Sequence, residues 1–189
     1  MGEIAIGFRA AIDLLITGDA QLYEIVWLSL AVSLSSVIIS TCLGVPIGAL
    51  IGTHTFPLKN ALLRIIYTFM SLPPVIAGLV VFLFIMRRGP LGSWGLTYTP
   101  AAMVIAQVCL VTPIIIGLTY NIVRDKAPKV KALAVTLGAG KVESLKLLIF
   151  ELRIGILAAI VTGLGRASSE DGAVMIVGGN IKGKTRVMT

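Results

Sequence analysis

The sequence predicts an all-α polytopic membrane protein. Of its 189 residues, 57% are apolar and only 13% are charged, whereas a soluble domain is roughly 45–50% apolar and about 25% charged. The apolar residues also form long runs, and a helix needs about 20 such residues to cross a hydrocarbon core about 30 Å thick. These observations exclude a soluble domain and a disordered chain.

Four apolar runs are the predicted membrane spans, and residues 1–189 are treated as one transmembrane domain. The runs cover residues 25–51, 65–86, 100–123 and 147–164. The fourth run has a short uncharged part, so its helix has to hold its charges at the membrane surface or continue past Arg166. On a continued helix Arg166 and Glu170, four residues apart, are placed to pair.

Charged residues between the runs predict the orientation. Residues 121–153 contain seven Lys or Arg and three Asp or Glu, and cytoplasmic loops carry an excess of Lys and Arg. This segment and the loop at 52–64 are therefore predicted to be cytoplasmic, with the N-terminus outside. The net charge of +7 is then a topology signal, and no nucleic-acid partner is expected. A short amphipathic helix at the membrane interface is predicted before the first span, around Phe8 to Leu15.

Glycine and proline mark the predicted contacts and breaks of the helices. Gly44, Gly48 and Gly52 repeat every four residues, which is typical of a face where membrane helices approach closely. Pro46, Pro113 and the pair Pro73 and Pro74 interrupt the apolar runs. Two interpretations stay open, namely broken helices around a transport path and ordinary packing kinks.

Residues that could support catalysis or bind a metal are sparse. Cys42 and Cys109 lie in apolar runs and His54 has no partner histidine, so no metal site is expected. Residues 178–185 match the phosphate-loop pattern G-x-x-x-x-G-K-[ST]. We reject a nucleotide site, because such a loop has to open a helix and only residues 186–189 follow. The sequence predicts no catalytic residue, no metal and no cofactor.

The basic segment 121–153 has a helical pattern of its own. Pro128 is predicted to start one helix, Gly138 to break it, and residues 141–147 to form a second helix that leads into the fourth span. Such an element suits docking in a groove on another protein. It also suits a basic interfacial helix bound to anionic membrane lipid.

Several segments resemble a known family. Ala132-Leu133-Ala134-Val135-Thr136-Leu137-Gly138-Ala139 resembles the coupling-loop signature E-A-A-x-x-L-G-A of ABC importer permeases. Residues 71–79, 89–92, 99–107 and 165–181 resemble the tungstate branch of these permeases. The likeness covers nearly the whole chain, and the segment 165–181 is the most specific to that branch.

The resemblance implies a type I-like permease core in the cytoplasmic membrane. It implies a homodimer that imports tungstate, molybdate or a similar oxyanion by alternating access. Cytoplasmic ABC ATPase subunits would drive it and an extracytoplasmic binding protein would deliver the anion. It also implies a cytoplasmic coupling loop within 121–147, in which the ATPase-coupling residues are Ala132, Leu133, Ala134, Thr136, Leu137, Gly138 and Ala139.

The chain departs from the family pattern in four respects. Ala132 replaces the glutamate of the coupling signature, Ile154 replaces a proline, and Asp171 replaces a small or apolar residue. The family also has a fifth, C-terminal span, which leads us to expect a truncated permease. A non-functional copy remains an alternative. The candidate residues of the translocation path are Ser71, Pro73, Pro74, Arg166, Glu170 and Gly172, and for Arg166 a structural pair with Glu170 is favoured over a contact with the anion.

Overall fold

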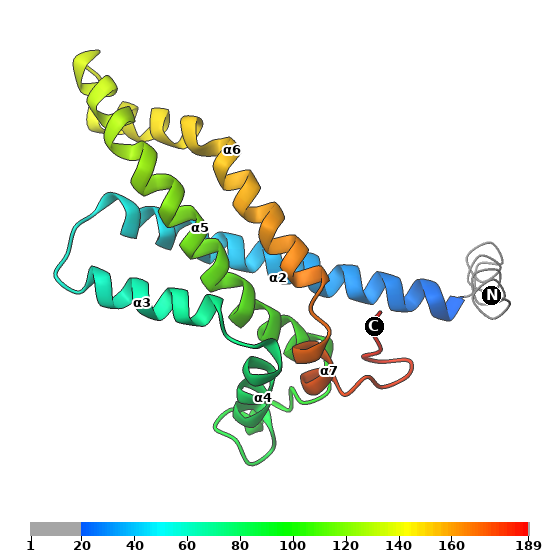
Figure 1. The fold of residues 1–189 in the computed structure, drawn as a ribbon. Helices are drawn as coiled ribbons and strands as arrows, with labels where there is room; N and C mark the ends of the chain where they lie inside the picture. Colours follow the sequence, from blue (N-terminus) through cyan, green and yellow to red (C-terminus); the bar gives the residue numbers. More distant parts are fainter. Residues whose placement is uncertain (1–19, 189) are drawn as a thin grey trace, which may run out of the picture.

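The computed structural model describes residues 20–188, and the regular structure in this part of the chain is helical (Figure 1). The elements are α2 (Ala20–Thr53), α3 (Lys59–Met70), α4 (Pro74–Ile85), the short 3₁₀ helix η1 (Gly92–Trp94), α5 (Pro100–Thr136), α6 (Lys141–Ser168) and α7 (Gly172–Gly178). The amphipathic helix predicted around residues 8–15 lies outside the described residues.

Within residues 20–188, three helices are long and apolar enough to cross a membrane, namely α2, α5 and α6. The predicted span at 65–86 is instead divided between α3 and α4, which meet at an angle of 101° and count as a fourth span only if the bent pair is taken as one. The break falls at Ser71, Leu72 and Pro73, where a proline cannot continue the hydrogen-bond ladder of α3. Pro46 and Pro113, in contrast, lie inside continuous helices.

Helices α2 and α5 pack side by side in the same direction, and the glycine face of α2 forms the contact. A Cβ atom at Gly44 would lie 2.9 Å from Ile115 Cγ2, and one at Gly52 would lie 2.6 Å from Val123 Cγ1. At Gly48 it would lie 2.7 Å from the carbonyl oxygen of Ile116. The prediction of close approach is confirmed, because only hydrogen at these positions lets the backbones come this near.

Helices α5 and α6 form an antiparallel hairpin whose turn lies far from the N-terminal end of α2 (Figure 1). Along the hairpin, Gly155 packs on Ile122 and Gly163 packs on Ile115. The prediction that Pro128 starts a helix is wrong, because α5 continues through it to Thr136. Burial of neighbouring apolar side chains against α6 holds this part of α5 helical despite the lost hydrogen bond.

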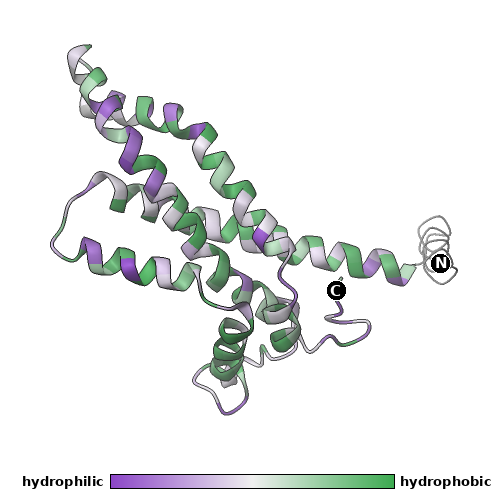
Figure 2. Ribbon diagram, viewed as in Figure 1, coloured by the Kyte–Doolittle hydropathy of each residue, from purple (hydrophilic) through white to green (hydrophobic). Residues whose placement is uncertain are grey.

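The relative positions of the helix ends agree with the predicted topology. Because α2 and α5 run in parallel, their C-terminal ends lie on one side, together with the loop at 54–58 and the turn between α5 and α6. Figure 2 shows hydrophilic residues gathered in the outer part of the α5–α6 hairpin, whereas the middle of each long helix is mainly hydrophobic. Exposed apolar side chains such as Leu34, Ile38 and Leu157 then face lipid or a partner subunit.

Candidate functional site

The turn between α5 and α6 carries the predicted coupling residues and exposes two leucines. Leu133 and Leu137 are 56% and 73% exposed, whereas Ala134 is fully buried. The two leucines are four residues apart, so they lie on one face at the end of α5. We call the turn with residues 132–139 the coupling tip. Leucines exposed beside polar neighbours are suited to a contact with another protein.

The coupling tip is a closed, hydrogen-bonded turn. Gly138 has φ of +71°, a conformation that glycine adopts without strain. The Ala139 N–H donates to the Ala134 carbonyl over 2.9 Å, which closes the end of α5 in the manner of a Schellman turn. The Gly140 N–H donates to Glu143 Oε2 over 2.8 Å at the start of α6. The break predicted at residues 137–139 is confirmed.

An apolar stem holds the coupling tip. Val123, Ala127 and Val130 of α5 pack with Leu148 and Leu152 of α6, and all five are buried. Because the two helices are packed together here, they move as one unit, and a force applied at the coupling tip is passed on to both helices.

The structure brings the two groups of predicted path residues to one region. Ser71, Pro73 and Pro74 lie at the break between α3 and α4, and Gly172 begins α7. A Cβ atom at Gly172 would lie 3.1 Å from Val75 Cγ2, in the first turn of α4. One turn further, a Cβ atom at Gly78 would lie 2.6 Å from Ala173 Cα. Helices α4 and α7 therefore contact each other closely.

Arg166 and Glu170 form the predicted pair, with Arg166 Nη2 lying 3.6 Å from Glu170 Oε2. The Glu170 side chain is 6% exposed and that of Arg166 is 38% exposed. Helix α6 ends at Ser168, so the pair spans the end of the helix and the following turn. Glu170 Oε1 also accepts the Ala173 N–H over 3.2 Å, which satisfies a donor in the first turn of α7. Glu170 thus connects α6 with α7.

A cavity of about 370 Å³ lies beside this connection. Its polar lining includes Ser29 and Ser33 of α2, Gln107 of α5, and Glu170. Sequence reasoning missed Gln107 and the serines. These residues could have been found as polar residues inside apolar runs, because a polar side chain in a membrane helix tends to hydrogen-bond with a neighbouring helix.

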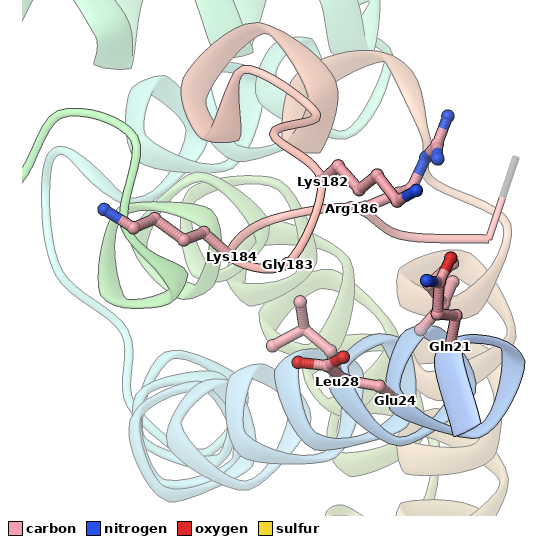
Figure 3. Close-up of a pocket in the computed structure, with 8 residues that line it drawn as sticks. Gln21, Glu24, Leu28, Lys182, Gly183, Lys184 and Arg186 are labelled. Carbon is pink, nitrogen blue, oxygen red and sulfur yellow. The ribbon is translucent and has the colours of Figure 1, made fainter.

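The phosphate-loop pattern does not form a phosphate site in the described part of the chain. Its first glycine, Gly178, ends helix α7, and residues 181–188 that follow are turns and irregular chain. Thr185 is buried and donates to the Gly178 carbonyl. A small pocket of about 100 Å³ lies nearby, but the Lys184 side chain points away from Lys182 and Arg186 (Figure 3). The basic side chains do not converge on one point.

These features define a polytopic helical membrane protein with a hairpin tip that is suited to contact a protein outside the bilayer. A sequence profile for the binding-protein-dependent transport system inner membrane component matches residues 44–169. The chain belongs to this family, and it is therefore a multi-pass permease of the cell membrane that works within an ABC importer.

Individual relatives agree with this assignment. The chain is 47% identical over 189 residues to the tungstate uptake system permease protein TupB of Peptoclostridium acidaminophilum, covering all of this chain and 83% of that protein. It is 33% identical over 183 residues to TupB of Campylobacter jejuni, covering 97% and 77% of the two proteins. A sulfate transport system permease protein, CysW of Escherichia coli, is 26% identical over 174 residues, covering 88% and 60%. The predicted resemblance to tungstate-type ABC importer permeases is confirmed.

Proposed function

We propose that this chain is the membrane subunit of a tungstate importer. The observation that carries the proposal is the 47% identity, along the entire chain, with a tungstate uptake permease. The sulfate permease among the relatives supports the wider class, because sulfate and tungstate are both tetrahedral dianions. The transport cycle is alternating access, in which helices open to one side of the membrane at a time.

The coupling tip, within a cytoplasmic loop at 121–147, is the proposed contact with the ATPase subunits. The exposure of Leu133 and Leu137 supports this role, since each offers an apolar side chain to a groove on a partner. The buried stem behind the tip would transmit movement into the spanning helices. The chain itself would have no catalytic activity, so labelling of the purified chain by a photoreactive ATP analogue would contradict this part of the proposal.

Two copies of the chain are proposed to enclose the translocation path. Ser71, Pro73 and Pro74 are candidates to line it, because they lie at an interrupted helix, beside the N-terminal end of α4, where the helix dipole favours an anion. Gly172 lies against the same helix end. Arg166 and Glu170 contribute to the path mainly through the connection of α6 with α7. An extracytoplasmic binding protein would deliver the anion.

The test is uptake of labelled tungstate by cells that lack their own permease and supply the cognate ATPase and binding protein. Uptake is expected only when this chain is also present. Excess molybdate and excess unlabelled tungstate are compared as competitors. If molybdate lowers the uptake of labelled tungstate more than unlabelled tungstate does, molybdate is the preferred substrate. Absence of uptake with the chain present in the membrane would refute the proposal.

A further inference from the structure

Gln107 connects three spanning helices from within the apolar part of α5. Its side chain is almost completely buried, with 3% of the residue exposed. Gln107 Oε1 accepts a hydrogen bond from the Ser36 hydroxyl of α2 over 2.8 Å. Gln107 Nε2 donates to the Ala167 carbonyl of α6 over 3.0 Å. We call this set of contacts the amide clamp.

The clamp holds α6 at the point where that helix ends. The last four carbonyl groups of a helix have no partner within the helix, and an unpaired carbonyl in a membrane is costly. Ala167 precedes the final residue of α6, and its carbonyl accepts from both Gln107 Nε2 and the Glu170 N–H. The clamp therefore adjoins the Arg166–Glu170 connection to α7.

Apolar packing is incomplete beside the clamp. The cavity of about 370 Å³ borders Gln107, and it separates this part of α2 from the turn after α6. Ser33 also borders the cavity, is 6% exposed, and makes no side-chain hydrogen bond within residues 20–188. Ala167 also packs with Val37 of α2 in an apolar cluster. On the side of the cavity, where packing leaves space, the two hydrogen bonds of Gln107 join the end of α6 to α2.

The opposite end of α6 is the coupling tip. Helix α6 has 28 residues and no proline. Its axis changes direction near the middle (Figure 1), and its length along the axis is about 42 Å at 1.5 Å per residue. An uninterrupted helix of this length passes a displacement at one end on to the other.

We propose that Gln107 is a positioning residue for transport: the amide clamp makes the middle of α2, the first part of α5 and the end of α6 move together when the coupling tip is displaced. This inference rests on the proposed function. Without the clamp, the tip could still engage the ATPase and permit ATP hydrolysis, but the far end of α6 would move without α2. Fewer anions would then cross for each ATP hydrolysed.

The test uses the complete complex of permease, ATPase and binding protein in proteoliposomes, with tungstate uptake and ATP hydrolysis measured in the same sample. Uptake by the wild-type complex is the control for the proposed function. If the wild-type complex takes up no tungstate, the proposed function is overturned, and that result does not bear on the clamp. For Gln107→Leu, which is similar in size but removes both hydrogen bonds, we expect roughly fivefold fewer anions per ATP, the order set by two interhelical hydrogen bonds in a membrane. ATP hydrolysis is expected to stay near the wild-type rate.

A matched control comes from the same pair of helices. The Thr112 hydroxyl donates to Ser40 Oγ over 3.1 Å and thus joins α2 with α5 but does not reach α6. Thr112→Val is expected to keep the wild-type number of anions per ATP. An equal loss in Thr112→Val and Gln107→Leu would overturn the inference, because any weakened helix contact would then have the same effect.

Ser36→Ala provides a second, milder variant, since it removes only one of the two hydrogen bonds of Gln107. It also removes the contact of the Ser36 hydroxyl with the Ser33 carbonyl inside α2. It is expected to lower the number of anions per ATP by a smaller factor than Gln107→Leu. If Gln107→Leu fails to enter the membrane, Ser36→Ala decides the question. The inference would be overturned if either variant assembles in the membrane and still transports the wild-type number of anions per ATP.

Discussion

Replacing Gly48 by alanine is expected to destabilise the packing of α2 on α5. The added Cβ would lie 2.7 Å from the Ile116 carbonyl oxygen and 2.8 Å from Thr119 Cβ. The first atom is part of the backbone, and the second is the Cβ of a β-branched side chain. Neither can move away from the new methyl group by a side-chain rotation. The two helices have to separate, and they lose contact along the face that Gly44 and Gly52 share.

The magnitude follows from two opposing contributions. Overpacking a close contact costs typically about 1–3 kcal/mol, and alanine gains about 1 kcal/mol over glycine inside a helix. The difference is about 0–2 kcal/mol, so a protein less stable by about 1 kcal/mol is expected. Gly165→Ala is the matched control, because Gly165 is also helical but its added Cβ would meet nothing within 4 Å. That variant is expected to be more stable by about 0.5–1 kcal/mol.

The assay is unfolding of the purified chain from mild detergent by increasing denaturant, with helix content and tryptophan fluorescence as readouts. Wild type, Gly48→Ala and Gly165→Ala are compared in the same detergent. A Gly48→Ala protein as stable as wild type would refute the close contact between α2 and α5. A Gly165→Ala protein as unstable as Gly48→Ala would show that the helix interior, and not the contact, determines the effect.

Three further predictions concern the hairpin and the turn after α6. Leu137→Ala removes a side chain that is 73% exposed, so it should leave unfolding unchanged but weaken binding of the ATPase subunit by at least about tenfold, because burying a leucine contributes roughly 1.5–3 kcal/mol. An unchanged Kd in a binding assay would exclude Leu137 from the contact. Gly138→Ala forces φ of +71° on a residue with a Cβ, so a loss of about 1 kcal/mol is expected in the same unfolding assay, and no loss would mean that the tip has another conformation. Glu170→Ala removes both the acceptor for the Ala173 N–H and the partner of Arg166. It should therefore lower the free energy of unfolding more than Arg166→Ala does, and the reverse order would indicate that Arg166 has the larger structural role.

Much of the architecture could be predicted from the sequence because it depends on local composition. Runs of apolar residues predicted the long helices, and the spacing of Gly44, Gly48 and Gly52 predicted the face that contacts α5. The charge between the runs predicted which loops lie on one side. A bilayer enforces such patterns, since each spanning segment has to satisfy its backbone internally and face hydrocarbon.

The prolines show where local signals were insufficient. Pro73 lies in the break between α3 and α4 and directly precedes α4, whereas Pro113 and Pro128 lie inside α5. The residue type is the same in each case. Contacts from α6 that hold α5 straight around Pro128 come from residues more than fifteen positions away, so their effect cannot be read from the local sequence.

Hydropathy, charge and short motifs are properties of neighbouring residues, so they were enough to predict a helical membrane permease and the turn between its last two long helices. Which polar groups meet depends on the tertiary structure. Ser36 and Gln107 are 71 positions apart, and Gln107 and Ala167 are 60 positions apart. Their contacts depend on the register of three packed helices, and that register is fixed by close packing along their whole lengths.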